Sequence, residues 1–241
     1  MSKTVDGKRW TADGDNAGDL LEIIYETDDL VAINKPHGLL VHRSKIANDA
    51  KVFALQLLRN QINQRVYPAH RLDRKTSGVL LFAKNPDTNT ALQRLFQERK
   101  IKKTYIALVR GFVENKGTID YAIGENGKVQ DAVTHYELIR QFEIPVPFGK
   151  HETSRYSLVK LSPETGRFHQ LRKHMAHIFH PIIGDRPHGC NKQNKLWKTR
   201  FDMTTMLLHA ESLEFEWEGE TLHIQAKKSE AFERTLRFLI A

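Results

Sequence analysis

Residues 70–78 combine one acidic side chain with several basic ones. Asp73 is the only carboxylate in this segment, and it stands among Arg71, Arg74 and Lys75. Nearby positive charge favours the ionised form of a carboxyl group, and an ionised, presented carboxylate can act as a nucleophile or as a base. The surrounding cations suit a polyanionic substrate. The segment therefore indicates chemistry on a nucleic acid, with a structural salt bridge in a loop as the simpler alternative.

A turn of small residues and an apolar strand follow Asp73. The side chains of Thr76 and Ser77 can hydrogen-bond to nearby backbone groups and hold a sharp turn at Gly78. Residues 79–82 are all apolar and predict a strand. Such a turn would fix the carboxylate at the mouth of a cleft.

A second basic segment, residues 165–174, opens a predicted helix after a glycine turn. Leu171, Met175 and Ile178 are spaced by four and three residues, which is typical of an amphipathic helix. Arg172 lies near the border of the apolar face, so it could reach a partly buried carboxylate and form a strong bidentate pair with it. A solvated basic helix is the alternative.

Tyr105 begins a predicted strand two residues after Lys103, which follows Lys102. A tyrosine in this position can stack on a nucleic-acid base while the lysines contact phosphates. A tyrosine that only packs in the core is the alternative.

Four histidines, at positions 169, 174, 177 and 180, raise the question of a metal site. The stretch contains no cysteine, and the H-E-x-x-H pattern of zinc proteases is absent. A serine hydrolase is also disfavoured, because the chain has no G-x-S-x-G. We therefore expect no metal.

The totals restrict the class of protein further. The 241 residues carry a net charge of +8, which favours a nucleic-acid partner over an anionic membrane. Cys190 is the only cysteine, so no intrachain disulfide is possible, which fits a reducing compartment. No apolar run approaches the ~18 residues of a membrane span, and residues 1–19 lack the apolar core of a secretory signal. A soluble, cytoplasmic protein is expected.

Local patterns predict a mixed α and β protein. Residues 1–19 are polar and predict a flexible tail, and residues 20–241 predict one folded domain. Strands are predicted over 30–33 and 105–109, a hairpin over 213–226, and helices over 52–62 and after Asn85, the last of which would bury Ala91, Leu92, Leu95 and Phe96. Residues 117–152 contain several glycines and prolines and predict long loops with short strands. The set favours an α+β fold with a largely antiparallel sheet.

Six blocks of this chain resemble the RluA superfamily of pseudouridine synthases. They are residues 34–38, 70–78, 103–105, 166–174, 180–185 and 207–210. The resemblance implies a single catalytic domain with a long, bent, mainly antiparallel sheet flanked by helices and loops, and no cofactor. Further blocks at 41–44, 132–136, 153–156 and 187–189 are similar to the branch that modifies uridine-65 of tRNA. The expected partner is therefore tRNA, with no membrane and no obligate protein partner.

The resemblance also implies a reaction and roles for single residues. In the family reaction the N1–C1′ bond of uridine breaks, the base turns, and C5 bonds to C1′. Asp73 would attack C1′ or take a proton from C2′, and both routes stay open. Arg172 would pair with Asp73 and hold it ionised, and Tyr105 would stack on the target base and is a candidate to assist proton removal from C5. Arg71 would enter the space left by the flipped nucleotide, since a stacked base cannot be rearranged.

The remaining site residues follow from the same resemblance. Leu171 and Leu208 would line the base pocket, and phosphates would be contacted by Lys102, Lys103, Arg167 and Lys173. Three rival functions stay open. They are a pseudouridine synthase of the same superfamily that acts on ribosomal RNA, an RNA-binding module without catalysis and, third, a metal-dependent hydrolase.

Overall fold

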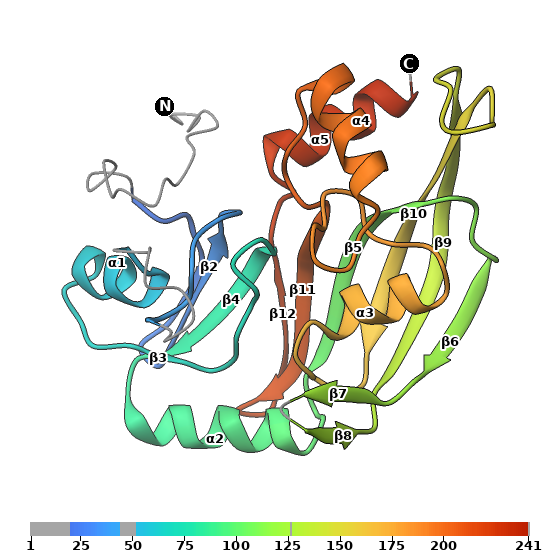
Figure 1. Ribbon diagram of the computed structural model, residues 1–241. Coiled ribbons are helices and arrows are strands. Elements are labelled where there is room, and N and C mark those ends of the chain that lie inside the picture. Colours follow the sequence, from blue (N-terminus) through green and yellow to red (C-terminus); the bar gives the residue numbers. More distant parts are fainter. Residues whose placement is uncertain (1–19, 44–51, 126, 241) are drawn as a thin grey trace. The chain divides into compact units, whose positions relative to one another are not determined.

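The computed structural model of the protein describes residues 20–43, 52–125 and 127–240 (Figure 1). The chain divides into two compact units. Unit 1 comprises Met1–Ile101 and Ala210–Glu230, and unit 2 comprises Lys102–His209 and Ala231–Ala241. The tail predicted over residues 1–19 lies outside the described residues.

Unit 1 contains a mainly antiparallel group of strands. Its elements are β1 (Ile23–Glu26), β2 (Leu30–Lys35), α1 (Ala54–Gln61), β3 (Tyr67–Pro68), β4 (Ser77–Ala83), α2 (Pro86–Gln97), β11 (Leu208–Trp217), which begins in unit 2, and β12 (Glu220–Gln225). The strand order is β1-β2-β4-β11, with β3 on β4 and β12 on β11. The pairs β1–β2, β2–β4, β3–β4 and β11–β12 are antiparallel.

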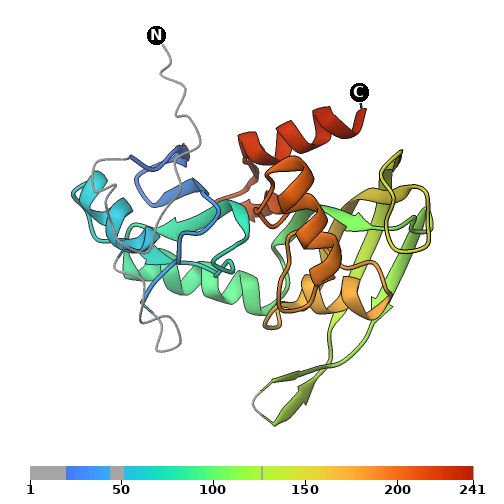
Figure 2. The same cartoon turned by 45° about the horizontal axis from the view of Figure 1, so that its top comes forward.

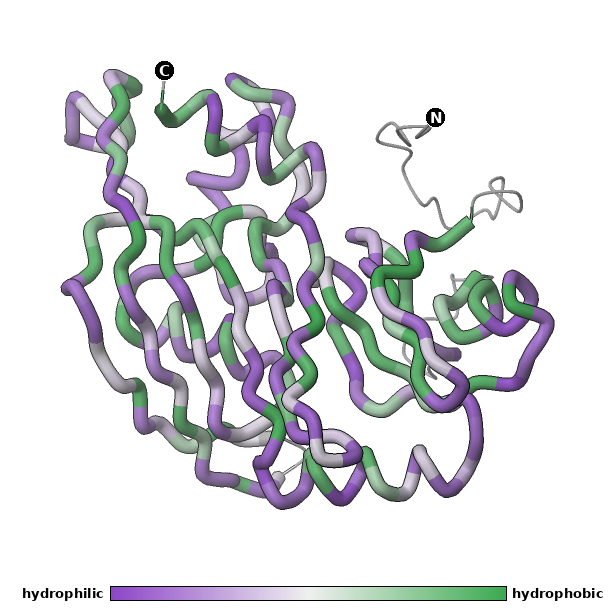
Figure 3. Tube along the Cα trace, turned by 180° about the vertical axis from the view of Figure 1, so that it is seen from behind, coloured by the Kyte–Doolittle hydropathy of each residue, from purple (hydrophilic) through white to green (hydrophobic). Residues whose placement is uncertain are grey.

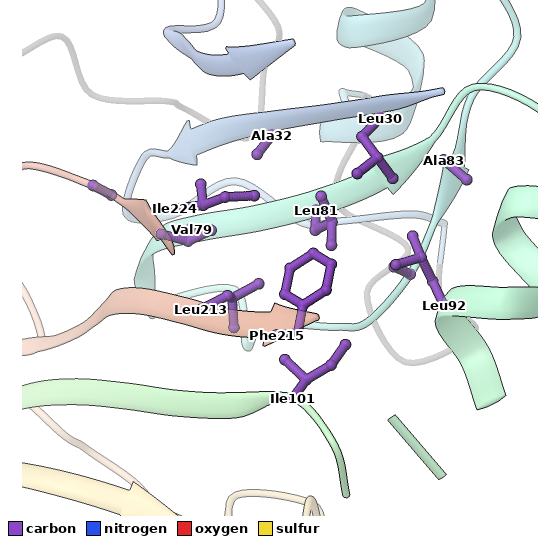
Figure 4. Packing of buried hydrophobic residues seen from close by; sticks show 12 residues of the cluster. Leu30, Ala32, Val79, Leu81, Ala83, Leu92, Ile101, Leu213, Phe215 and Ile224 are labelled. Carbon is purple, nitrogen blue, oxygen red and sulfur yellow. The ribbon is translucent and has the colours of Figure 1, made fainter. Parts of the chain in front are cut away.

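The core of unit 1 lies between its sheet and α2. Figure 4 shows Leu30, Leu81 and Phe215 from three strands converging with Leu92 of α2. The predicted strand over 30–33 and the predicted hairpin are confirmed, and the hairpin register sets Leu213 opposite Ile224. Alternation of apolar residues fixes that register, because a slip by one residue would turn the apolar face to water.

Helix α2 begins as its sequence predicts. The side chain of Asn85 caps it by accepting a hydrogen bond from the Thr88 backbone N–H at 2.8 Å. Leu92 is fully buried and Leu95 and Phe96 are partly buried, but Ala91 is exposed, so that part of the prediction is wrong. The face of the helix that contacts the core contains Thr88, Leu92, Leu95 and Phe96, and Ala91 lies at the edge of this face.

Unit 2 contains a second group of antiparallel strands. Its elements are β5 (Lys102–Arg110), β6 (Lys116–Asp120), β7 (Ile123–Glu125), β8 (Lys128–Gln130), β9 (Val133–Ile144), β10 (Ser154–Pro163), α3 (Gln170–His177), α4 (Asn191–Phe201) and α5 (Glu230–Ile240), whose first residue is counted in unit 1. The order β5-β10-β9-β6 is antiparallel throughout. The β7–β8 hairpin extends away from these strands (Figure 2).

Strand β9 corrects the prediction of long loops over residues 117–152. It is 12 residues long, and it was missed because its apolar residues do not alternate regularly. The register with β10 shifts between Leu158 and Val159, which pair with Arg140 and Leu138, so Ile139 is left over and is exposed. Figure 3 shows hydrophobic and hydrophilic residues alternating irregularly along the strands here.

Helices pack against both faces of the unit 2 strands, and on the second face they reach only part of the strands. Successive strand residues point to opposite faces. One face packs against α3, which crosses the strands in Figure 1, and its cluster includes Ala107, Val109, Val159, Leu161, Leu171 and Met175. The other face packs against α4 and α5, and its cluster includes Ile106, Leu108, Tyr156, Leu158, Trp197 and Phe232. The prediction of an amphipathic helix at Leu171 is therefore confirmed. None of the helices in the described ranges is long and apolar enough to cross a membrane.

Candidate active site

Asp73 lies in the loop that leads into β4, and backbone hydrogen bonds close this loop. The Thr76 N–H donates to the Asp73 carbonyl at 3.0 Å. The Gly38 N–H donates to the Arg74 carbonyl at 2.8 Å, and Arg74 Nε donates back to the Gly38 carbonyl at 3.0 Å. Asp73 itself is partly buried. The turn lies at residues 74–75, earlier than the predicted turn at residues 76–78, because Ser77 and Gly78 already belong to β4. It is tied to the turn that follows β2.

Gly78, the second residue of β4, occupies a position that requires a glycine. Its φ is +110°, a value that other L-residues rarely adopt. A Cβ atom at this position would lie 2.1 Å from the Ala210 carbonyl oxygen. Any larger residue would push β4 and β11 apart and would move the Asp73 loop with them.

Lys35, the last residue of β2, is a functional candidate that the sequence did not indicate. Its side chain is fully buried, and Nζ donates to the carbonyls of Pro36 at 2.9 Å, Leu39 at 2.8 Å and Arg74 at 3.3 Å. Burial lowers the pKa of this amine to about 7, and the charge of Asp73 acts in the opposite direction. Lys35 therefore ties two turns together beside Asp73. Lys35 stands in the block at residues 34–38 that resembles the family, but nothing in the sequence singled it out within that block.

We expect Lys35 to change how stability depends on pH. Its folded-state pKa of about 7 lies below the ordinary value of 10.5, so between these values the unfolded chain holds a proton that the folded chain has lost. The free energy of unfolding then rises with pH across this window, by up to about 1.4 kcal/mol per pH unit. Urea unfolding of the wild type and Lys35→Met at pH 7 to 9.5 measures the difference. Equal slopes for the two proteins would refute the burial of a titrating amine.

Two histidines near the Asp73 loop, His37 and His70, do not add to its positive charge at neutral pH. Burial lowers the pKa of His37 to about 4, with further lowering by the charges of Lys35, Lys75 and Arg74. His70 Nε2 lies 3.1 Å from the Leu81 N–H and accepts its hydrogen bond. At neutral pH the positive charge around Asp73 therefore comes from lysine and arginine.

Unit 2 brings together three residues predicted for the base pocket. Leu171 and Leu208 are buried, at 6% and 3% exposure, in one hydrophobic cluster. Tyr105, partly buried on β5, packs against the same cluster. Because Arg172 directly follows Leu171 on α3, these four residues come from one region of unit 2. Asp73 and Arg71 belong to unit 1.

Arg172 forms a buried bidentate ion pair with Asp185. Nε donates to Oδ2 and Nη2 donates to Oδ1, each at 2.8 Å, and the two side chains are 5% and 1% exposed. The inference that Arg172 reaches a buried carboxylate is confirmed, but Asp185 was missed as that carboxylate. The predicted pairing of Arg172 with Asp73 joins residues of different units and stays a prediction. One arginine can donate hydrogen bonds to two carboxylates, because its guanidinium has five N–H donors.

The start of α3 is fixed by the side chain of Gln170. Its Oε1 accepts from the Arg167 N–H at 3.0 Å and from Thr165 Oγ1 at 2.7 Å. Its Nε2 donates to the Val133 carbonyl at 2.9 Å and to Thr134 Oγ1 at 3.0 Å. Since a buried amide with all its partners resists displacement, Gln170 holds the first turn of α3, which contains Arg172, in place.

Three of the predicted phosphate-binding residues hydrogen-bond to backbone carbonyls. Lys103 Nζ donates to the Thr165 carbonyl at 3.1 Å, and Arg167 Nε donates to the Asp131 carbonyl at 3.1 Å. Lys173 Nζ lies 3.3 Å from the Gly124 carbonyl. These carbonyl partners orient the three cations. Lys102 and Arg71 are exposed.

Each of the four histidines of the α3 region contacts other side chains or backbone groups, and His174 and His177 share Tyr121. His169 Nδ1 lies 2.8 Å from His188 Nε2, His174 lies 3.0 Å from Thr134 Oγ1, His177 stacks on Tyr121, and His180 lies 2.8 Å from the Arg110 carbonyl. Burial lowers the pKa of His174. Within the described ranges, no group of three His, Cys, Asp or Glu side chains could hold a metal ion.

Comparisons with known proteins define the class. The family model described as RNA pseudouridylate synthase matches residues 29–177, a range that spans both units. The chain is 47% identical over 228 residues to tRNA pseudouridine synthase C of Yersinia pestis, covering 89% of each chain. It is 46% identical over 207 residues to the protein of the same name from Vibrio parahaemolyticus, covering 81% of this chain and 84% of the relative.

Solved structures support the same class at the level of the fold. Human RNA Pseudouridylate Synthase Domain Containing 1 superposes with a TM-score of 0.72 at 24% identity, covering 94% of this chain and 96% of that one. Human RNA Pseudouridylate Synthase Domain Containing 4 gives a TM-score of 0.69 at 26% identity, with coverages of 91% and 93%. The predicted α+β pseudouridine-synthase fold is confirmed.

The chain belongs to the RNA pseudouridylate synthase family. Enzymes of this class are isomerases, so the motifs at Asp73, Tyr105 and Arg172 stand in a chain whose class requires a catalytic centre.

Proposed function

We propose that this enzyme isomerises a uridine of tRNA, the one at position 65, to pseudouridine. The observation that carries the choice of tRNA is the 47% identity to a tRNA pseudouridine synthase C over 89% of both chains. The blocks at residues 132–136 and 153–156 support the same branch. The first block leads into β9 and the second into β10, and Tyr136 of the first packs against the same cluster as Tyr105.

Asp73 is the catalytic group in this proposal. Glycosidases use two carboxylates because one activates water and the other protonates a leaving group. In this reaction the base stays bound and attacks the sugar again through C5, so a single carboxylate suffices. The loop around Asp73 supports this role, because its hydrogen bonds to Gly38 and Lys35 hold the backbone on either side of the turn. The carboxylate attacks C1′ or removes a proton from C2′.

Arg172 and Tyr105 complete the proposed site. Arg172 pairs with Asp73 through the donors that Asp185 leaves over, and Asp185 sets the orientation of the guanidinium. Tyr105 stacks on the target base and assists the loss of the C5 proton. Leu171 and Leu208 give the base an apolar surface to lie against, and uridine leaves its stack to reach them.

Basic residues hold the RNA in this proposal. Arg71 fills the space of the flipped nucleotide. Phosphates are contacted by Lys102, Lys103, Arg167 and Lys173. The reaction exchanges one glycosidic bond for another, so it consumes no cofactor. A cytoplasmic location follows from the substrate and fits a chain whose only cysteine is Cys190.

Substrate mapping tests this proposal. Unmodified tRNA transcripts with uridine or cytidine at position 65 are incubated with the enzyme, in parallel with fragments of ribosomal RNA. Pseudouridine is then located by chemical marking and primer extension. We expect modification at position 65 of tRNA and none in the cytidine transcript. Modification confined to ribosomal RNA would favour the rival substrate, and RNA binding without any pseudouridine would favour the inactive binding module.

A further inference from the structure

A small hollow lies beside helix α4, outside the residues assigned above. Its volume is about 160 Å³, and residues from α4 and from the loop before it line it, among them Gly184, Arg186, Asn194, Lys195 and Lys198. Pockets for drug-sized ligands start near roughly 300 Å³, so this hollow suits a smaller group. Its polar lining is dominated by positive charge.

The packing of α4 explains why its cations face outward. Trp197 is 1% exposed, and its ring centroid lies 5.2 Å from that of Tyr156 and 6.5 Å from that of Phe238 on α5. Gln193, one turn earlier, is buried and hydrogen-bonded to the Tyr156 hydroxyl. With this face held in the core, Lys195 and Lys198 remain exposed on the other side of the helix.

Positive charge is concentrated in this region, and the nearest acidic residue after it is Asp202, the C-cap of α4. Residues 186–201 contain Arg186, Lys192, Lys195, Lys198 and Arg200 and no acidic residue. Asp185, which precedes them, is buried in its pair with Arg172. In the part of the chain that the structure describes, Arg186, Lys195 and Lys198 form no ion pair with a carboxylate. Unpaired cations around a small hollow are the environment that a phosphate group prefers.

The hollow is built on the loop that carries Asp185. Asn194 Oδ1 accepts from the Gly184 N–H at 2.9 Å, and Asn194 Nδ2 donates to the Asp185 carbonyl at 2.7 Å. Gly184 has φ +82°, and a Cβ there would lie 2.1 Å from the Thr205 carbonyl oxygen. The wall of the hollow and the partner of Arg172 therefore share one rigid segment, so a group bound here has a fixed place within unit 2.

We propose that the hollow formed by Arg186, Lys195, Lys198 and Asn194 binds a backbone phosphate of the RNA substrate. This inference rests on the proposed function, to which it adds a contact point on α4. The contact reads no base, so it positions the RNA without selecting sequence. Arg186 reaches the phosphate from the loop, and the two lysines reach it from the helix.

The test compares two double variants with equal loss of charge. Lys195→Gln with Lys198→Gln removes the cations of the hollow. Lys116→Gln with Lys160→Gln is the control, since these lysines line a different hollow of unit 2, of about 590 Å³, where Lys160 lies 4.0 Å from Glu137. Affinity for unmodified tRNA is measured by filter binding from 50 to 200 mM salt. Thermal unfolding of each variant verifies that it is folded.

We expect the α4 variant to bind tRNA about tenfold more weakly at the lowest salt and its log–log salt slope to fall by about 1, because a phosphate contact releases counterions. The control keeps the slope and the affinity of the wild type. An equal loss of tRNA affinity in both variants would mean that the lysines act only through long-range electrostatic attraction, and it would overturn the proposal. Unchanged tRNA binding by the α4 variant would overturn it as well. Because binding is scored without turnover, absence of pseudouridine in the wild type would defeat the proposed function separately.

Discussion

Asp73→Asn is expected to lower the rate of pseudouridine formation by about 10⁴-fold or more, since loss of a nucleophile or its base commonly costs this much. An amide neither attacks C1′ nor accepts a proton from C2′. The side chain keeps its size, and the backbone bonds that close the loop, from Thr76 to residue 73 and from Gly38 to Arg74, do not involve the carboxylate. The fold and the affinity for tRNA should therefore stay close to those of the wild type.

Chromatography of digested tRNA measures pseudouridine for this variant, and filter binding measures affinity. Asp87→Asn, in the first turn of α2, is the matched control, because it removes an exposed carboxylate from the same unit. It should retain full activity. If Asp73→Asn turned over within tenfold of the wild type, the catalytic role would have to move to another residue.

Asp185→Ala is expected to cost about 3–5 kcal/mol of the free energy of unfolding, because it leaves the buried guanidinium of Arg172 without this partner. Glu143→Ala is the control. It breaks the exposed Arg155–Glu143 pair, whose side chains are 57% and 38% exposed, and such pairs contribute about 0–1 kcal/mol. Urea unfolding measures both variants.

A second variant separates the pair from the packing around it. Replacing both partners, with Arg172→Met and Asp185→Leu, removes the uncompensated charge and should recover part of the lost stability. The double variant should nevertheless be inactive, since the proposed partner of Asp73 is gone. Equal losses for Asp185→Ala and Glu143→Ala would mean that the buried pair contributes no more than a surface pair.

The sequence predicted elements whose pattern follows one rule from end to end. The hairpin at Leu213 and Ile224 alternates strictly, and α2 starts at a cap followed by proline, so both were found. Strand β9 breaks its alternation at Ile139, where one residue has no partner on β10, and it was missed. Local patterning fails where a bulge changes which residues face the core.

The candidate site was predicted in its motifs and missed in its supports. Asp73, Tyr105 and Arg172 stand in blocks that resemble a family, whereas the burial of Lys35 and the choice of Asp185 as a partner depend on contacts between distant segments. A lysine after a strand is usually solvated, so no local rule places it among three carbonyls. Such second partners are set by tertiary packing, which spacing alone does not contain.

The measurement that tests the central claim most directly follows the hydrogen at C5. Transcripts of tRNA that carry tritium at C5 of uridine are treated with excess wild-type enzyme, and the label released to water is counted. Bonding of C5 to the sugar must expel that hydrogen, so we predict release of one label per tRNA, with none from the Asp73→Asn variant. Retention of the full label by the wild type on tRNA that it binds would contradict the isomerisation proposed for this chain.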